Sequence, residues 1–507
     1  MRLQAPVDAL EVAALLESIA ITDEVAATRY GAPDTFALAD TVMSLARARG
    51  VGSEPQPAQA QPEASWRQVM RDYARGPTSM LPVVVLLLIV EAYRRLGHWS
   101  EADLLVFISA VSASLVVTNG FVQAASRRGA IYLSRGLIRT AQAFLLRVMT
   151  AGALCVAAVA LGTFVVSNAF GLMSPAQELI FVLTFIALGS IWLIAGVLAI
   201  VEAPAAVGLG LGAGLATAVV VDQTVARFSP NPITAATLAG LAVTMAILLR
   251  AVRRALGRIA GSQAAVPKLA PVGYLVHEAA PYFGYGLLYM VFVLLPHALG
   301  WLAAALRGTT QSNDFAALEV GMTIALLPII VASGVPEHAA REFWSRARAG
   351  LISAYGESRW MFAHTLGRFY RQHLAYYLLA LAGVSLVVVL TFQVLLQAHV
   401  LGHWLRISDV GRAQHVFWVG LGGYGLLGCG LFNCLFIVTL GRAGRAIRAV
   451  AVGMAVSLAV GLPLALAFDP SFAVAGFLAG SAAFLVTTSW ETAIFLRAAD
   501  YYFYAAN

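Results

Sequence analysis

Apolar runs of about 20 residues recur along this chain from Pro77 almost to its C-terminus. A run of that length is what an α-helix needs to cross a bilayer, and a helix satisfies its backbone hydrogen bonds internally, as lipid requires. Hydrophobic residues make up 60% of the chain and charged residues only 12%, which is too apolar for a water-soluble core of ordinary size. The sequence therefore predicts an all-α polytopic membrane protein.

We expect about twelve transmembrane helices, arranged as two six-helix bundles. The first bundle covers 77–250, the second covers 270–507, and the basic cytoplasmic linker 251–269 joins them. The predicted spans are 77–93, 102–125, 141–168, 178–201, 204–222, 233–250, 270–303, 315–336, 370–398, 414–440, 449–468 and 471–496. Similar stretches, "NGFVQAASRRGAIYLSRG" and "SGVPEHAAREFWSRARAG", follow the second and eighth spans, which favours an internal duplication with parallel halves.

The arginines predict the orientation of the chain. Most of them lie in the connections after the second, sixth, eighth and tenth spans, whereas the alternate connections hold few. Because basic connections stay on the cytoplasmic side, we expect these connections and both termini to be cytoplasmic.

The N-terminal region differs in character from the rest of the chain. Residues 1–50 place apolar side chains at helical spacing and predict a small cytoplasmic helical element. Residues 51–76 begin as a Pro/Gln/Ala-rich linker and end in "SWRQVMRDYARG", which indicates an interfacial amphipathic helix. The first 75 residues lack the apolar segment of a cleavable signal peptide, so we expect the mature protein to keep them.

Motifs for enzymatic chemistry are missing from the sequence. "HEAAP", 277–281, begins like the zinc motif HExxH, but Pro281 occupies the place of the second histidine, so we expect no metal there. No GxxxxGK[ST] loop is present, and the glycines of "GLGLGAGLA", 208–216, predict close helix packing in lipid. The three cysteines lie in apolar runs, which offers no disulfide framework. We expect a protein that is not an enzyme and has no cofactor.

The seventh span carries the clearest polar pattern. Glu278, Tyr282, Tyr285 and Tyr289 are spaced i, i+4, i+7 and i+11, which places them on one side of a helix. We expect this stripe to line the cytoplasmic half of a substrate path, because tyrosines offer flat apolar faces to sugar rings and hydroxyls to their edges. Pro281 favours a bend that a gate can use. The alternative is that the tyrosines pack against a neighbouring helix and the bend is static.

Other polar residues in the spans are further candidates for the substrate path. Polar and ionised groups are costly in lipid, so each marks either a pathway or an interfacial or internally paired residue. These candidates are Asn119, Arg147, Glu319 and Glu491.

The connection 337–372 after the eighth span mixes aromatic residues with arginines. This composition predicts a cytoplasmic amphipathic excursion that contacts anionic lipid headgroups or docks a cytoplasmic partner, and it gives no indication of nucleic-acid binding. The candidate residues of this surface are Arg341, Trp344, Arg346, Arg348 and Trp360.

Several stretches carry a resemblance to a known family. They are "APYFGYGLLYMVFVLLPHALGW" (280–301), "EHAAREFWSRARAG", "LGRFYRQHLAYY", "GLFNCLFIVTLGRAGRAIRAV" and "DYYFY". With the predicted span pattern, they make residues 77–504 resemble the MOP flippase superfamily, and most of all the membrane exporter subunit of Pel-type exopolysaccharide systems.

This resemblance implies a multi-pass protein of the bacterial inner membrane whose two bundles rock about a central cavity without ATP hydrolysis. The function it implies is export of an exopolysaccharide or lipid-linked glycan for biofilm formation, with a cytoplasmic glycosyltransferase and other export components as partners. One alternative is a drug or metabolite exporter of the same superfamily. Another is a non-transporting membrane scaffold that recruits the glycosyltransferase.

Overall fold

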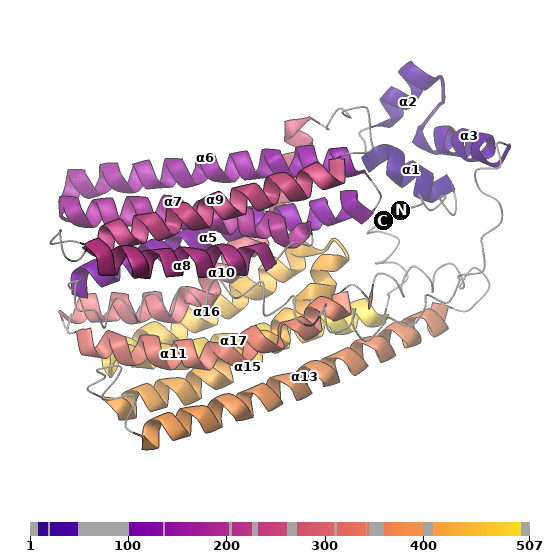
Figure 1. The fold of residues 1–507 in the computed structure, drawn as a ribbon. Coiled ribbons are helices and arrows are strands. Elements are labelled where there is room, and N and C mark those ends of the chain that lie inside the picture. Colours follow the sequence, from indigo (N-terminus) through magenta and orange to yellow (C-terminus); the bar gives the residue numbers. More distant parts are fainter. Residues whose placement is uncertain are drawn as a thin grey trace.

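The structure is a computed structural model in which every regular element of the described residues is a helix (Figure 1). It describes residues 9–18, 21–48, 73, 101–134, 137–201, 205–225, 232–260, 271–308, 312–340, 342–343, 359–398 and 409–497.

Eleven helices in the described ranges are long and apolar enough to cross a membrane. They are built on α5 (Glu101–Ser134), α6 (Ile138–Phe170), α7 (Pro175–Ile200), α8 (Ala205–Val225), α9 (Pro232–Ala260), α10 (Val272–Arg307), α11 (Ser312–Ala332), α13 (Arg359–Gln397), α15 (Val410–Thr439), α16 (Ala443–Ala467) and α17 (Ala473–Arg497). They coincide with the second to the twelfth predicted spans, whereas the first, 77–93, lies outside the described residues. The predicted all-α, multi-pass membrane fold is confirmed.

Three short helices form the predicted N-terminal element: α1 (Ala9–Ser18), α2 (Asp23–Tyr30) and α3 (Thr35–Ala48). Val12 of α1 packs with Ala39 and Met43 of α3 in a small core of their own. Asp23 accepts hydrogen bonds from the backbone N–H and the hydroxyl of Thr35, at 2.8 and 2.7 Å, and so ties the start of α2 to that of α3. These helices lie beyond one end of the bundle (Figure 1).

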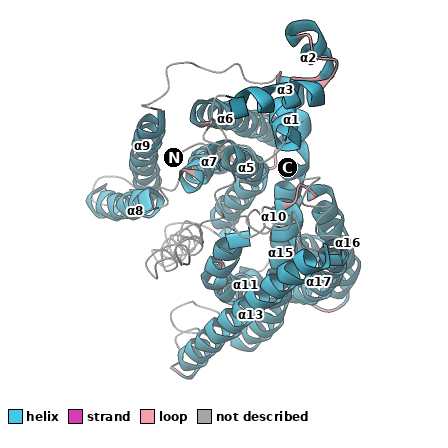
Figure 2. Ribbon diagram, turned by 90° about the vertical axis from the view of Figure 1, so that its right-hand side faces the viewer, coloured by secondary structure: helices cyan, strands magenta, loops and turns pink. Residues whose placement is uncertain are grey.

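The spanning helices form two groups. Helices α5 to α9 contact one another, helices α10 to α17 contact one another, and the groups meet where α5 lies along α10 (Figure 2). Three pairings recur six spans apart: α5 with α7 and α11 with α15, α7 with α9 and α15 with α17, and α8 with α9 and α16 with α17. This recurrence is what an internal duplication predicts. The exact bundle boundaries stay a prediction.

Because the helices alternate in direction, the connections after α5, α9, α11 and α15 lie at one end of the bundle, the right-hand end in Figure 1. We call it the arginine-rich end, since the basic connections of the sequence fall there. The positive-inside rule predicts that this end is cytoplasmic.

Small residues bring neighbouring helices into close contact. A Cβ atom added to Gly240 of α9 would lie 2.7 Å from the carbonyl oxygen of Gly214 of α8, and one added to Gly214 would clash with Thr244. The Thr244 hydroxyl lies 2.9 Å from the carbonyl of Gly240 and 3.1 Å from that of Gly210. Close helix packing is thus seen at Gly210 and Gly214 of the stretch 208–216, whereas nothing lies within 4 Å of a Cβ atom added to Gly212.

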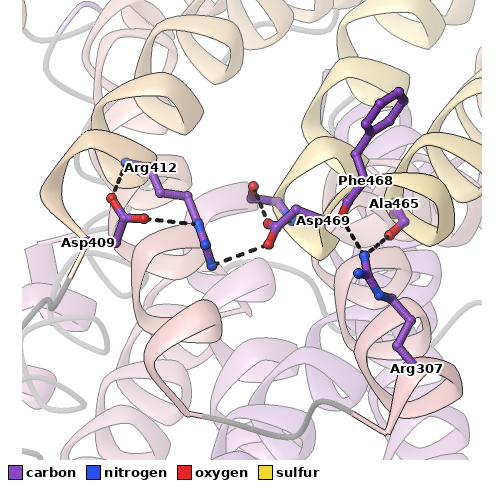
Figure 3. Close-up of polar contacts among 7 residues, drawn as sticks. Arg307, Asp409, Arg412, Ala465, Phe468 and Asp469 are labelled. Carbon is purple, nitrogen blue, oxygen red and sulfur yellow. Dashed lines mark hydrogen bonds and ion pairs between the residues drawn. The ribbon is translucent and has the colours of Figure 1, made fainter.

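At the opposite end, two arginines cross-link the second half (Figure 3). Arg412 of α15 lies 3.4 Å from Asp409, the N-cap of its own helix, and 3.3 Å from Asp469, the N-cap of the short helix η2 (Pro470–Phe472). Arg307 of α10 donates to the carbonyl of Phe468 at 2.6 Å, at the C-terminal end of α16, where a helix favours a positive charge. These contacts hold α10, α15, α16 and η2 together.

Candidate functional site

A polar cluster joins the two halves near the arginine-rich end, between α5 and α10. Arg128 forms an ion pair with Glu278, and the Tyr274 hydroxyl donates to the same carboxylate at 2.9 Å. The neighbouring Arg127 hydrogen-bonds with Tyr282. We call these five residues the polar latch. Its ion pair is largely withdrawn from solvent, because the side chains of Arg128 and Glu278 are only 16% and 20% exposed.

Farther along α10, the same two helices approach more closely still. The side-chain amide of Asn119 donates to the carbonyl of Gly286 at 2.7 Å. A Cβ atom on Gly286 would lie 2.6 Å from Cγ of Gln123, and one on Gly120 would lie 2.7 Å from the ring of Phe283. The structure therefore places Asn119, a predicted pathway residue, in a tight contact between the halves.

The predicted tyrosine stripe leads from the polar latch into the second half. Tyr282 belongs to the latch, whereas Tyr285 is 8% exposed and lies in the apolar core built with α15, α16 and α17. Tyr289 stacks on Tyr285, with ring centroids 6.2 Å apart. Tyr285 and Tyr289 are thus packed among the helices of the second half, which is the arrangement that the alternative interpretation describes; the role of the stripe in a pathway stays a prediction.

Two further tyrosines approach the end of this stripe. Tyr377 of α13 and Tyr424 of α15 are 1% and 2% exposed, and both lie near Tyr289. Three helices therefore contribute phenol groups to one region inside the second half.

Glu319 of α11 lies next to this region. One of its carboxylate oxygens is 3.5 Å from Nε2 of His297, and the indole of Trp301 approaches the same carboxylate. The other oxygen, Oε1, and the indole N–H of Trp301 are buried without a hydrogen-bond partner of ordinary length. A half-buried carboxylate with a free acceptor can bind a cation or a sugar hydroxyl.

The two remaining pathway candidates lie apart from these groups. Glu491 of α17 is paired with Arg445 of α16 at 2.7 Å, and Arg448 lies 4.0 Å away, so its charge is already compensated. Arg147 is exposed on α6, next to the exposed Leu146. Glu491 is therefore an internally paired residue, as one of the two interpretations expects. Arg147 belongs neither to the polar latch nor to the groups around Glu319.

Pro281 is exposed and lies within α10, which continues as one helix on both sides of it. The carbonyl of residue 277 lacks its helical donor there, because proline has no N–H. The predicted role of Pro281 in a gate stays a prediction.

The predicted partner surface is described only in part. Arg341, Trp344, Arg346 and Arg348 lie outside the described residues, and of Trp360 only the backbone is described. That backbone belongs to α13, which begins at Arg359, so the last part of the predicted excursion is continuous with the ninth span.

Several members of these clusters were missed from the sequence. Arg127 and Arg128 enter the sequence analysis only through the basic connection that predicts the orientation of the chain. They follow directly after a predicted span, and a side chain at that position can reach the adjoining helix. Tyr274 precedes Glu278 by four residues and extends the stripe by one turn, a signal that was available. Tyr377 and Tyr424 sit in apolar runs that resemble ordinary packing.

The fold has counterparts among solved structures. The Vibrio cholerae MATE transporter VcmN in its bent form matches with a TM-score of 0.59 at 15% identity, over 86% of this chain and 98% of that chain. A multidrug resistance MATE family transporter of the MOP superfamily, in an outward-facing conformation, gives 0.60 at 13% identity over 89% and 100%. A MOP superfamily transporter from Pyrococcus furiosus gives 0.61 at 14% identity over 88% and 99%.

No protein-family model matches the sequence, and no curated protein matches it. At identities this low the structural likeness speaks for the fold. The chain has the fold of the MATE transporters of the MOP superfamily.

Proposed function

We propose that this protein is an inner-membrane exporter that moves a glycan or lipid-linked glycan outward by alternating access. The observation that carries the proposal is the contact between α5 and α10, where the polar latch ties the halves together near the arginine-rich end. In the predicted orientation, the latch closes the cytoplasmic side. Breaking its ion pair lets the halves separate there and admit substrate.

Support for a glycan comes from the aromatic residues of the second half. Tyr285, Tyr289, Tyr377 and Tyr424 combine apolar faces with hydroxyl groups, which suits the C–H surfaces and polar edges of sugar rings. They are packed in the apolar cores of the second half in the present conformation, so the proposal requires these side chains to become accessible as the halves rock. Glu319, with Oε2 beside His297 and Oε1 without a hydrogen-bond partner of ordinary length, is the group we assign to a coupling cation or a substrate hydroxyl.

A drug or metabolite exporter is the second candidate. It is favoured by one specific observation, that a solved protein of the same fold is described as a multidrug resistance transporter. The scaffold alternative rests on residues 1–63 and on the surface in 337–372, much of which lies outside the described residues.

One deletion experiment separates the three functions. We expect loss of the gene to abolish a surface polymer without changing drug sensitivity, and wild-type protein to restore the polymer. Complementation with Glu278→Gln or Tyr285→Ala, after both are shown to be folded and inserted, should leave polymer export impaired. A changed drug sensitivity with intact polymer supports the second candidate. Silent substitutions, with all activity lost on deletion of 1–63, support the scaffold.

A further inference from the structure

Three metal-ligating side chains converge near the arginine-rich end of the second half, on different helices from the polar latch. His338 and Glu342 lie one turn apart in the helical residues that follow α11, and His373 lies on α13. Their donor atoms all lie within 4.8 Å of one another. We propose that this triad binds a divalent transition-metal ion such as Zn²⁺, which proteins commonly hold with imidazole and carboxylate ligands.

Two of the three separations between donor atoms fit a single ion. Nε2 of His373 is 3.0 Å from Oε2 of Glu342, and Nε2 of His338 is 3.4 Å from the same oxygen. Zinc bonds of about 2.0–2.2 Å in a tetrahedral arrangement place neighbouring donors about 3.3 Å apart. The two measured separations lie on either side of that value.

The hydrogen bond behind His373 sets its tautomer. Nδ1 of His373 lies 3.0 Å from the carbonyl oxygen of Phe369, and because a carbonyl only accepts, Nδ1 carries the proton. In the neutral ring, Nε2 then directs a lone pair at Glu342, which repels the carboxylate at 3.0 Å. A metal ion between these groups would accept a lone pair from each ring and from the carboxylate. A backbone carbonyl behind a histidine is a usual outer-shell partner of a metal ligand.

The surroundings of the triad shield much of it from solvent. The side chains of His338, Glu342 and His373 are 14%, 25% and 5% exposed, so an ion can enter but is mostly shielded. The ring of Tyr73 stacks on His338 with centroids 5.3 Å apart, and its backbone packs on Gly334. An ion there would fix α13 to the helical residues after α11, next to Tyr73.

Metal content of the purified full-length chain tests this proposal. We expect protein stripped with a chelator, exposed to Zn²⁺ and desalted to retain about one equivalent per chain and to unfold at a higher temperature than the stripped protein. His338→Gln, Glu342→Gln and His373→Gln should each lose both effects. His364→Gln removes an exposed histidine of α13 and should keep both.

Substitution with Co²⁺ provides a second readout, since a tetrahedral site gives intense visible absorption bands that octahedral water does not. Wild-type protein without retained Zn²⁺, or a His338→Gln variant that retains as much as wild type, would overturn the proposal. If the His373→Gln variant does not fold, zinc retention by the His338→Gln variant still tests the proposal, because His338 is only partly buried. The measurement needs no transport, so its outcome is independent of the proposed export function.

Discussion

Arg128 of α5 and Glu278 of α10 form an ion pair that links the two halves of the chain near its arginine-rich end. The carboxylate also accepts a hydrogen bond from Tyr274, so three residues share one charge-compensated site. Removing one partner of a largely buried pair leaves an uncompensated charge, which costs more than the pair itself contributes. We therefore expect this ion pair to set how easily the halves separate at this end.

Reversing one charge of the pair should open this end of the protein. We expect Arg128→Glu to place two carboxylates together and shift the conformational equilibrium by about 1.4 kcal/mol or more, a tenfold change in population. The measurement is the distance between spin labels placed on the two halves at the arginine-rich end. The double variant Arg128→Glu with Glu278→Arg should restore the wild-type distance distribution; a double variant as open as the single one would contradict the latch.

Enlarging Gly286 should separate α5 from α10. The Cβ atom alone would meet Gln123 and the backbone of Asn119 within 2.7 Å, so Gly286→Leu must displace a helix. Overpacking of this kind costs about 1–3 kcal/mol and should lower the thermal unfolding temperature by several degrees. Gly425→Leu on α15 is the control, because nothing lies within 4 Å of a Cβ there. Equal losses for the two variants would show that the contact is not tight.

Neutralising Glu319 should reduce transport without reducing folding. Glu319→Gln keeps the shape of the side chain but removes the charge next to His297, and we expect about a tenfold lower export rate, as loss of one positioned charge implies. The rate is compared at equal protein in the membrane. Asp409→Asn, at the same end of the second half, keeps an N-cap and should transport normally. Export by Glu319→Gln at the wild-type rate would exclude the carboxylate from coupling.

The N-terminal element should depend on pH through Asp23. The two hydrogen bonds from Thr35 lower the pKa of the Asp23 carboxyl. A lowered pKa stabilises the folded element above the ordinary aspartate range, and that stability is lost as the pH falls through the lowered value. Thr35→Val should therefore speed amide hydrogen exchange in α2 and α3 relative to wild type at neutral pH, and the difference should vanish in strong acid. A difference that persists in acid would exclude the carboxylate as its source.

Much of the fold is predictable from the sequence, because lipid imposes a length on every spanning helix. The starts and ends of the helices are less predictable. The predicted second span ends at 125, whereas α5 continues to Ser134, because its polar last turns stay helical. The ninth span likewise begins eleven residues early, at Arg359, as the amphipathic residues before it continue the same helix. Hydropathy detects the segment inside the hydrocarbon, whereas backbone hydrogen bonding carries the helix beyond it.

The clusters of the candidate site are harder to predict, because they join residues far apart in the chain. Helical spacing placed Glu278 and Tyr282 on one face, but the arginines that contact them come from a helix about 150 residues earlier. The same reason hides the metal triad, since His373 lies on another helix, 31 residues beyond Glu342. A single sequence gives spacing along one helix and leaves the pairing of helices open.

The cross-links around Arg412 and Arg307 bear on how the second half can move. Helices α10, α15, α16 and η2 are linked to one another at the end opposite the latch. We therefore expect these helices of the second half to turn together as one rigid body. The close contact of Asn119 with Gly286 lies between the two ends of the bundle, and the two halves can pivot about it. Under the proposed alternating access, we expect spreading of the helices at the arginine-rich end to draw them together at the other, so that the two ends of the protein do not open at the same time.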